Sequence, residues 1–150
     1  MSAFVTTYPG IVRALVSEVG VVTGWVGDKA QYVPCKALWD TGAVYSVISS
    51  ELAKKLDLVA FDCGRAYTAQ GSYATSVYLL DVMLPNQMVI KDLRVSHGEF
   101  QDFDFLIGMD IIAHGDLNLS NAGKTRFSFR IPSEGDTPFN LQPATGGNGL

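Results

Sequence analysis

The sequence predicts a small, mostly β protein, and two observations carry this prediction. Short runs rich in Val, Ile, Tyr, Phe and Thr alternate with turn signals along most of the chain. The chain has 150 residues and is 47% hydrophobic, which is enough for one folded core and too little for two. We therefore expect one domain over residues 1–131, followed by a flexible tail over residues 132–150.

Composition and charge exclude several classes of protein. The chain has 11 basic and 15 acidic residues without a basic run, so we expect no nucleic-acid partner. Arg13 and Glu18 interrupt the apolar N-terminal region, and no apolar run reaches membrane-spanning length. We therefore expect a cytoplasmic protein without membrane contact.

Metal and cofactor chemistry has little support in the sequence. Cys35 and Cys63 lack the spacing of a metal site, and we expect both to be free thiols. Glu99, Asp102 and Asp104 form an acidic cluster, but their spacing is not that of a calcium loop, which favours a solvated strand face. We expect neither a metal nor a cofactor.

The first half of the chain contains strand patterns and one helix pattern. Ser50 is the predicted cap of the helix, since an acidic residue follows it and two lysines come near the helix end. The predicted elements are strands over residues 11–16, 19–22 and 31–39, a turn over residues 24–28 and the helix over residues 51–56.

The second half is dominated by a long hairpin pattern. Residues 65–84 are rich in Tyr, Thr, Ser and Val, with a turn signal at Gln70-Gly71-Ser72. The other predicted elements are a strand over residues 88–95, a short helix over residues 109–114, a turn over residues 121–124 and a terminal strand over residues 126–131.

The stretch with the clearest chemistry is Asp40-Thr41-Gly42-Ala43, at the end of the strand predicted for residues 31–39. We expect Asp40 to lie inside, where a carboxylate costs several kcal/mol unless it has hydrogen-bond partners. The Thr41 hydroxyl and nearby backbone N–H groups are the expected donors. From these residues alone, an acidic turn that merely caps a strand remains an open interpretation.

The stretch from Ala37 to Ala43 resembles the active-site loop of aspartic peptidases, which reads hydrophobic-hydrophobic-Asp-Thr-Gly-Ala. Phe105-Leu106-Ile107-Gly108 is similar to the second signature of that family, and the spacing from Asp40 to Gly108 also agrees. The match is to the single-domain, retropepsin-like branch and covers roughly residues 11–131. The resemblance implies a closed-barrel-like acid protease fold with one or two short helices.

The resemblance also implies an activity and an assembly. It assigns catalytic roles to Asp40, Thr41 and Gly42 in an endopeptidase that acts on peptide or protein substrates. Such enzymes hold a water between two carboxylates, and this chain carries one Asp-Thr-Gly sequence and no Asp-Ser-Gly sequence. We therefore expect a homodimer in which each subunit contributes one Asp40.

In the family, a hairpin at the position of residues 65–84 closes over the substrate as a flap. The residues implied to bind substrate are therefore Ala43 and the hairpin tip, which consists of Gln70, Gly71, Ser72 and Tyr73. Val44 and Tyr45 stand where many retroviral enzymes carry acidic residues, and Met109 replaces a common basic residue. Specificity should therefore differ from that of the retroviral enzymes.

Two other functions compete with the peptidase. A non-catalytic dimeric module of the same fold would use the groove to bind peptides without cleaving them. A role for Asp40 as a phosphoryl acceptor is disfavoured, because no Gly-rich phosphate loop accompanies it.

Overall fold

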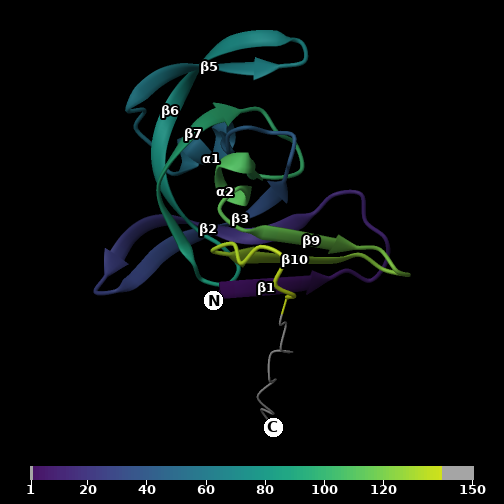
Figure 1. The fold of residues 1–150 in the computed structure, drawn as a ribbon. Coiled ribbons are helices and arrows are strands. Elements are labelled where there is room, and N and C mark those ends of the chain that lie inside the picture. The colour runs from purple at the N-terminus through teal and green to yellow at the C-terminus, as the bar shows by residue number, and fades with distance from the viewer. Residues whose placement is uncertain (1, 140–150) are drawn as a thin grey trace. The chain divides into compact units, whose positions relative to one another are not determined.

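A computed structural model describes residues 2–139 of the chain (Figure 1). The chain divides into two compact units. Unit 1 comprises residues 1–12 and 114–150, of which residues 2–12 and 114–139 are described, and unit 2 comprises residues 13–113.

Unit 2 is built on strands with two short helices between them. Its elements are β2 (Val16–Val26), β3 (Lys29–Trp39), β4 (Val47–Ser49), α1 (Ser50–Lys55), β5 (Asp62–Thr68), β6 (Gly71–Met83), β7 (Val89–Gly98), β8 (Phe105–Ile107) and α2 (Met109–Ile112). The strands form one seven-stranded sheet in the order β2-β3-β8-β4-β7-β6-β5. β2 also pairs with β6, which closes the sheet into a barrel that leaves β5 outside. The predicted mostly β barrel with short helices is confirmed.

The core of unit 2 follows from the alternation of side chains along its strands. On β3, Cys35, Ala37 and Trp39 are buried while Pro34 and Lys36 are exposed, as expected when successive side chains point to opposite faces. The short neighbouring strands β4 and β8 contribute fully buried Ile48, Phe105 and Ile107. Burial of each such side chain stabilises the fold by about 1.5–3 kcal/mol.

Helix α1 lies where the sequence predicts it, with its cap one residue earlier. The Ser49 hydroxyl, rather than that of Ser50, accepts a hydrogen bond from the Leu52 N–H at 3.0 Å. Glu51 stands in the first turn and two lysines stand in the last turn, in line with the helix dipole.

The predicted long hairpin is formed by β5 and β6, which extend as a teal arm in Figure 1. Their register ends at the pair Thr68 and Gly71, so the turn comprises residues 69–70 rather than 70–72. Gly71 has a φ of 135°, a conformation that side chains rarely adopt. Strand β7 continues to Gly98, three residues beyond the predicted end.

The strand predicted over residues 11–16 is wrong, since β2 begins at Val16. Backbone groups in this stretch bond elsewhere. The Val12 N–H donates to the Thr125 hydroxyl at 2.9 Å, and the Leu15 carbonyl accepts from the Trp39 N–H at 2.9 Å. These contacts replace a strand ladder there, which an apolar pattern alone does not reveal.

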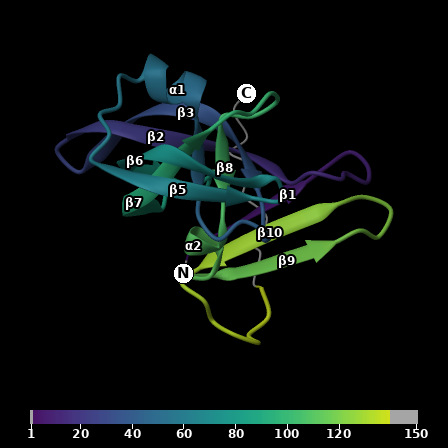
Figure 2. The same ribbon diagram turned by 90° about the horizontal axis from the view of Figure 1, so that it is seen from above.

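Unit 1 is a three-stranded antiparallel sheet in the order β1-β10-β9, with β9 and β10 side by side in Figure 2. Its strands are β1 (Ser2–Thr7), β9 (Asp116–Ser120) and β10 (Arg126–Ile131). On one face the Phe4 ring contacts the rings of Phe127 and Phe129, with centroids 5.8 and 6.3 Å away. β10 has its predicted bounds, whereas β1 and β9 were not predicted.

A buried arginine ties residues 133–137 to this sheet. The Arg130 side chain is fully buried, and its Nε and Nη2 donate to Asp116 Oδ2 at 2.9 and 2.6 Å. Arg130 also donates to the carbonyls of Thr137 and Gly135, while Asp116 accepts from Ser133 and from the Glu134 N–H. The predicted domain boundary after residue 131 stays a prediction, and residues 140–150 of the predicted tail lie outside the described residues.

These contacts give Asp116 a pH-dependent role in stability. Hydrogen bonds from Ser133, then from Glu134 and Arg130, lower the pKa of Asp116 from 3.8 to about 2. Since the folded-state pKa lies below the unfolded one, the carboxylate stabilises the fold above about pH 4, and this contribution is lost as the pH falls towards 2. We expect Asp116→Asn to lower the free energy of unfolding near neutral pH, by a difference that shrinks below about pH 4.

Urea titrations of both proteins at a series of pH values, followed by circular dichroism, measure this difference. A difference that stayed constant down to about pH 2 would contradict the assigned role.

Candidate active site

Asp40 is positioned by a parallel pair of strands. β3 pairs with β8 so that Ala37 is opposite Phe105 and Trp39 is opposite Ile107. The Asp40 N–H continues this ladder by donating to the Ile107 carbonyl at 2.9 Å. On β3, the buried indole N–H of Trp39 donates to the Ser17 hydroxyl at 2.9 Å and fixes the strand end. Asp40 is therefore the first residue beyond a tightly held strand.

The Asp40 carboxylate is half-buried, whereas a buried position was expected. Its Oδ1 accepts from the Gly42 N–H at 2.8 Å, the one side-chain hydrogen bond of Asp40 among the described residues. A Cβ at Gly42 would lie 3.2 Å from Oδ1, so glycine leaves room for the carboxylate. Thr41 is exposed.

The loop after Gly42 is held by the start of helix α2. The N–H groups of Met109 and Asp110 donate to the carbonyls of Ala43 and Val44 at 2.8 and 3.1 Å. This contact requires Gly108, because a Cβ there would lie 2.7 Å from the carbonyl carbon of Tyr45. Gly108 therefore has a steric role behind the loop.

A side-chain pair, Ser46 and Asp110, also holds this loop, and we call this pair together with the Gly108 N–H the brace. The backbone N–H and hydroxyl of Ser46 donate to Oδ2 and Oδ1 of Asp110 at 2.8 and 2.7 Å. The Ser46 hydroxyl, which is fully buried, also accepts from the Gly108 N–H at 3.1 Å. These two positioning residues were missed from the sequence, although an acidic residue two positions after Gly108 was a usable signal.

A groove with a volume of about 670 Å³ lies between this loop and the β5–β6 hairpin. Cross-strand pairing brings Gly64 opposite Thr75, and Val77 opposite Ser96, so these four positions share one face of the strands, and all four line the groove. The residues that line the groove are Gly42, Ala43, Val44, Tyr45, Val47, Gly64, Arg65, Ala66, Tyr67, Thr75, Val77, Arg94, Val95 and Ser96.

The predicted site residues fall into two groups. Gly42 and Ala43 line the groove, whereas Asp40 and Thr41, which precede them in the loop, are not among the lining residues. The catalytic roles of Asp40, Thr41 and Gly42 and the binding role of Ala43 stay predictions. Gln70, Gly71, Ser72 and Tyr73 lie at the hairpin tip and are not among the residues that line the groove. Their role in binding substrate stays a prediction.

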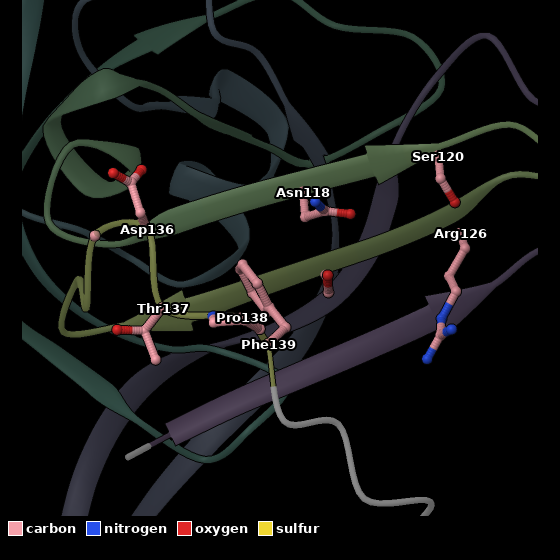
Figure 3. A pocket seen from close by; sticks show the side chains of 9 residues that line it. Asn118, Ser120, Arg126, Asp136, Thr137, Pro138 and Phe139 are labelled. Carbon is pink, nitrogen blue, oxygen red and sulfur yellow. The ribbon is translucent and has the colours of Figure 1, made fainter.

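A second cavity, of about 690 Å³, belongs to unit 1 (Figure 3). The polar side chains of Asn118, Ser120 and Arg126 line it on the sheet, and Phe139 lines it from the segment that follows. The ring of Phe139 lies 4.3 Å from the Arg130 guanidinium. This cavity shares no residue with the Asp40 loop and adds nothing to its chemistry.

Within residues 2–139, no cluster of three or more His, Cys, Asp and Glu side chains is arranged to hold a metal ion. In the same part of the chain, no helix is both long and apolar enough to cross a membrane. Both cysteines are free, as expected, with Cys35 buried and Cys63 exposed.

Residues 29–114 match the model of a protein family described as gag-polyprotein putative aspartyl protease. The match includes the Asp40 loop, the hairpin and Gly108. The chain belongs to this family. No curated protein matches the chain significantly in sequence.

Several solved structures are similar to this chain. A retropepsin-like aspartic protease from Rickettsia conorii is 18% identical, with a TM-score of 0.54, and the match covers 85% of this chain and 93% of that one. The Simian Foamy Virus (mac) protease is 17% identical, with a TM-score of 0.48 and coverage of 66% and 92%. The retroviral protease-like domain of Ddi1 from Leishmania major is 20% identical, with a TM-score of 0.47 and coverage of 71% and 81%. The first of these shows that the chain has the retropepsin-like fold.

The brace predicts a stability loss for Ser46→Ala. The substitution leaves the Gly108 N–H without its acceptor and removes one donor from the Asp110 carboxylate, so the free energy of unfolding should fall by about 1–3 kcal/mol. Chemical denaturation measures the change. Ser120→Ala, at an exposed position, is the control and should change stability by less than about 0.5 kcal/mol. Equal stability of the two variants would contradict the brace.

Proposed function

We propose that the protein is an aspartic endopeptidase whose active site forms between two copies of the chain. The observation that carries the proposal is the position of Asp40. Its half-buried carboxylate stands at a strand end beside the groove, and among the described residues one N–H from its own loop bonds to it. Such a carboxylate keeps capacity for a partner and a water.

Chemistry requires a second carboxylate. One must take a proton from the attacking water while the other, protonated, polarises the scissile carbonyl. Two carboxylates at hydrogen-bonding distance do not both ionise readily, so they share a proton, a behaviour established for aspartic peptidases as a class. The chain has one Asp-Thr-Gly sequence, and a two-fold axis through this loop would supply the second Asp40.

The surface around the loop supports an interface there. Val44 and Tyr45 are 66% and 68% exposed, and Met109 beside them is 36% exposed. Three large apolar side chains gathered at one site favour contact with another protein surface. Association across this loop would bury them and bring the two carboxylates together.

The proposed roles of the remaining residues follow from their places. Gly42 holds the Asp40 carboxylate through its N–H, and Thr41 would bond across the axis to the partner loop. An extended peptide would lie in the groove over Ala43, with the tip from Gln70 to Tyr73 closing over it. The water then attacks the peptide bond, and the shared proton passes to the leaving amine.

Asp40→Asn tests the catalytic role with little structural change. Asparagine keeps the Oδ1 that accepts from Gly42, so folding and dimerisation should persist. Loss of acid–base chemistry should lower kcat by about 10²- to 10⁴-fold. Digestion of a mixed peptide library, read by mass spectrometry, measures cleavage by both proteins.

Full activity in an Asp40→Ala variant would overturn the proposal. A library that the wild type binds but leaves intact would instead favour the non-catalytic dimeric peptide-binding module.

The dimer is tested separately by Met109→Asp. A charge at this half-exposed position should weaken association, so that sedimentation shows monomer and specific activity falls more steeply on dilution. Val59→Asp, at a loop residue that is 85% exposed, is the control and should change neither the association nor the dependence of specific activity on dilution. A monomeric wild type with undiminished activity on dilution would exclude the shared active site.

A further inference from the structure

The groove beside Asp40 has an uneven charge. Among the residues that line it, Arg65 and Arg94 are charged and none is acidic. The other side chains around these two are small or apolar, including Ala43, Val47 and Val77. A peptide bound in this groove would therefore contact positively charged side chains surrounded by apolar ones.

The strand register shows that the two arginines do not point the same way. Arg94 is opposite Leu79 on β6, two positions from Val77, so its side chain shares the face of Val77 that lines the groove. Arg65 is opposite Ala74, on the other face of the hairpin, where its Nη2 donates to the Ser72 hydroxyl at 2.7 Å. Both arginines line the groove, but Arg65 is held by Ser72, and Arg94 is the arginine on the face of Val77.

The neighbours of Arg94 position its guanidinium but leave some of its N–H donors available to a ligand. Its Nη2 lies 3.2 Å from Asp62 Oδ2, and the Phe61 ring centre is 5.0 Å from its Cζ. The ion pair is open to solvent, with side-chain exposures of 59% and 52% for Arg94 and Asp62. Such pairs contribute little, and a guanidinium has five donors, so a second carboxylate can bind at the same time.

We propose that Arg94 selects substrates that carry a glutamate or aspartate side chain next to apolar residues. This inference rests on the proposed peptidase and names its substrate class. The planar guanidinium fork suits a carboxylate, and the groove offers that carboxylate no competing acid among its lining residues. Asp62 weakens this preference for acidic substrates, because its carboxylate already forms an ion pair with the Arg94 guanidinium.

The test uses a set of apolar peptides in which each position in turn is Glu, Gln or Lys. Wild-type kcat/KM should favour Glu over Gln by roughly fivefold at one position, and should disfavour Lys there. Arg94→Gln should bring the Glu-to-Gln ratio close to one, and Asp62→Asn should raise it. Arg13→Gln is the control, because it removes an arginine at an exposed position that does not line the groove and should leave the ratio as in the wild type.

Binding of the same peptides to Asp40→Asn, followed by fluorescence anisotropy, separates this inference from the peptidase itself. If peptides are cleaved but Arg94→Gln keeps the wild-type ratio, the inference is overturned and the peptidase stands. If no peptide is cleaved but Glu peptides bind in an Arg94-dependent way, the peptidase is overturned and the groove preference stands. Equal binding of Glu and Gln peptides to proteins with and without Arg94 overturns the preference in either case.

Discussion

The pairing of the short strand β8 with two neighbours is the constraint on which the candidate site depends. β8 is parallel to β3 on one side and antiparallel to β4 on the other. The Asp40 loop leaves the sheet at the end of β3 and returns at β4, so both of its ends are fixed to the same strand. Gly108 and α2 follow β8 directly and bond to the middle of the loop. One continuous segment thus sets where the carboxylate stands.

The two walls of the groove are supported to different degrees. The loop wall is bonded to α2 through main-chain carbonyls and through the Ser46–Asp110 pair. The opposite wall is the β5–β6 hairpin, and β5 stands at the sheet edge with β6 as its one neighbour in the described sheet. A strand paired on one side requires less free energy for local opening than a strand paired on both sides. This difference agrees with the proposed function, in which the loop wall stays fixed and the hairpin closes over a peptide.

The elements that could be predicted from the sequence are those whose formation depends on residues close together in the chain. The turn at Asp40, the hairpin, the capped helix and β10 each carry a local signal in residue type or alternation, and each is present. β9, which was not predicted, carries such a signal in Leu117 and Leu119, because these residues alternate with polar ones. Ser46 and Asp110 could not be paired from the sequence, because the parallel β3–β8 ladder that joins their segments has no local signature.

The loop can differ from the retroviral pattern at Val44 and Met109 and keep its conformation, because main-chain groups at these positions make the contacts that hold it. At Ala43, Val44 and Met109, backbone groups make the contacts that brace the loop. The side chains of Val44 and Met109 take no part in these main-chain contacts and are exposed. The same holds for Arg94, whose ladder position is set by its backbone while its side chain faces the groove. At these positions, main-chain hydrogen bonds hold the backbone, and the proposed specificity is left to the side chains.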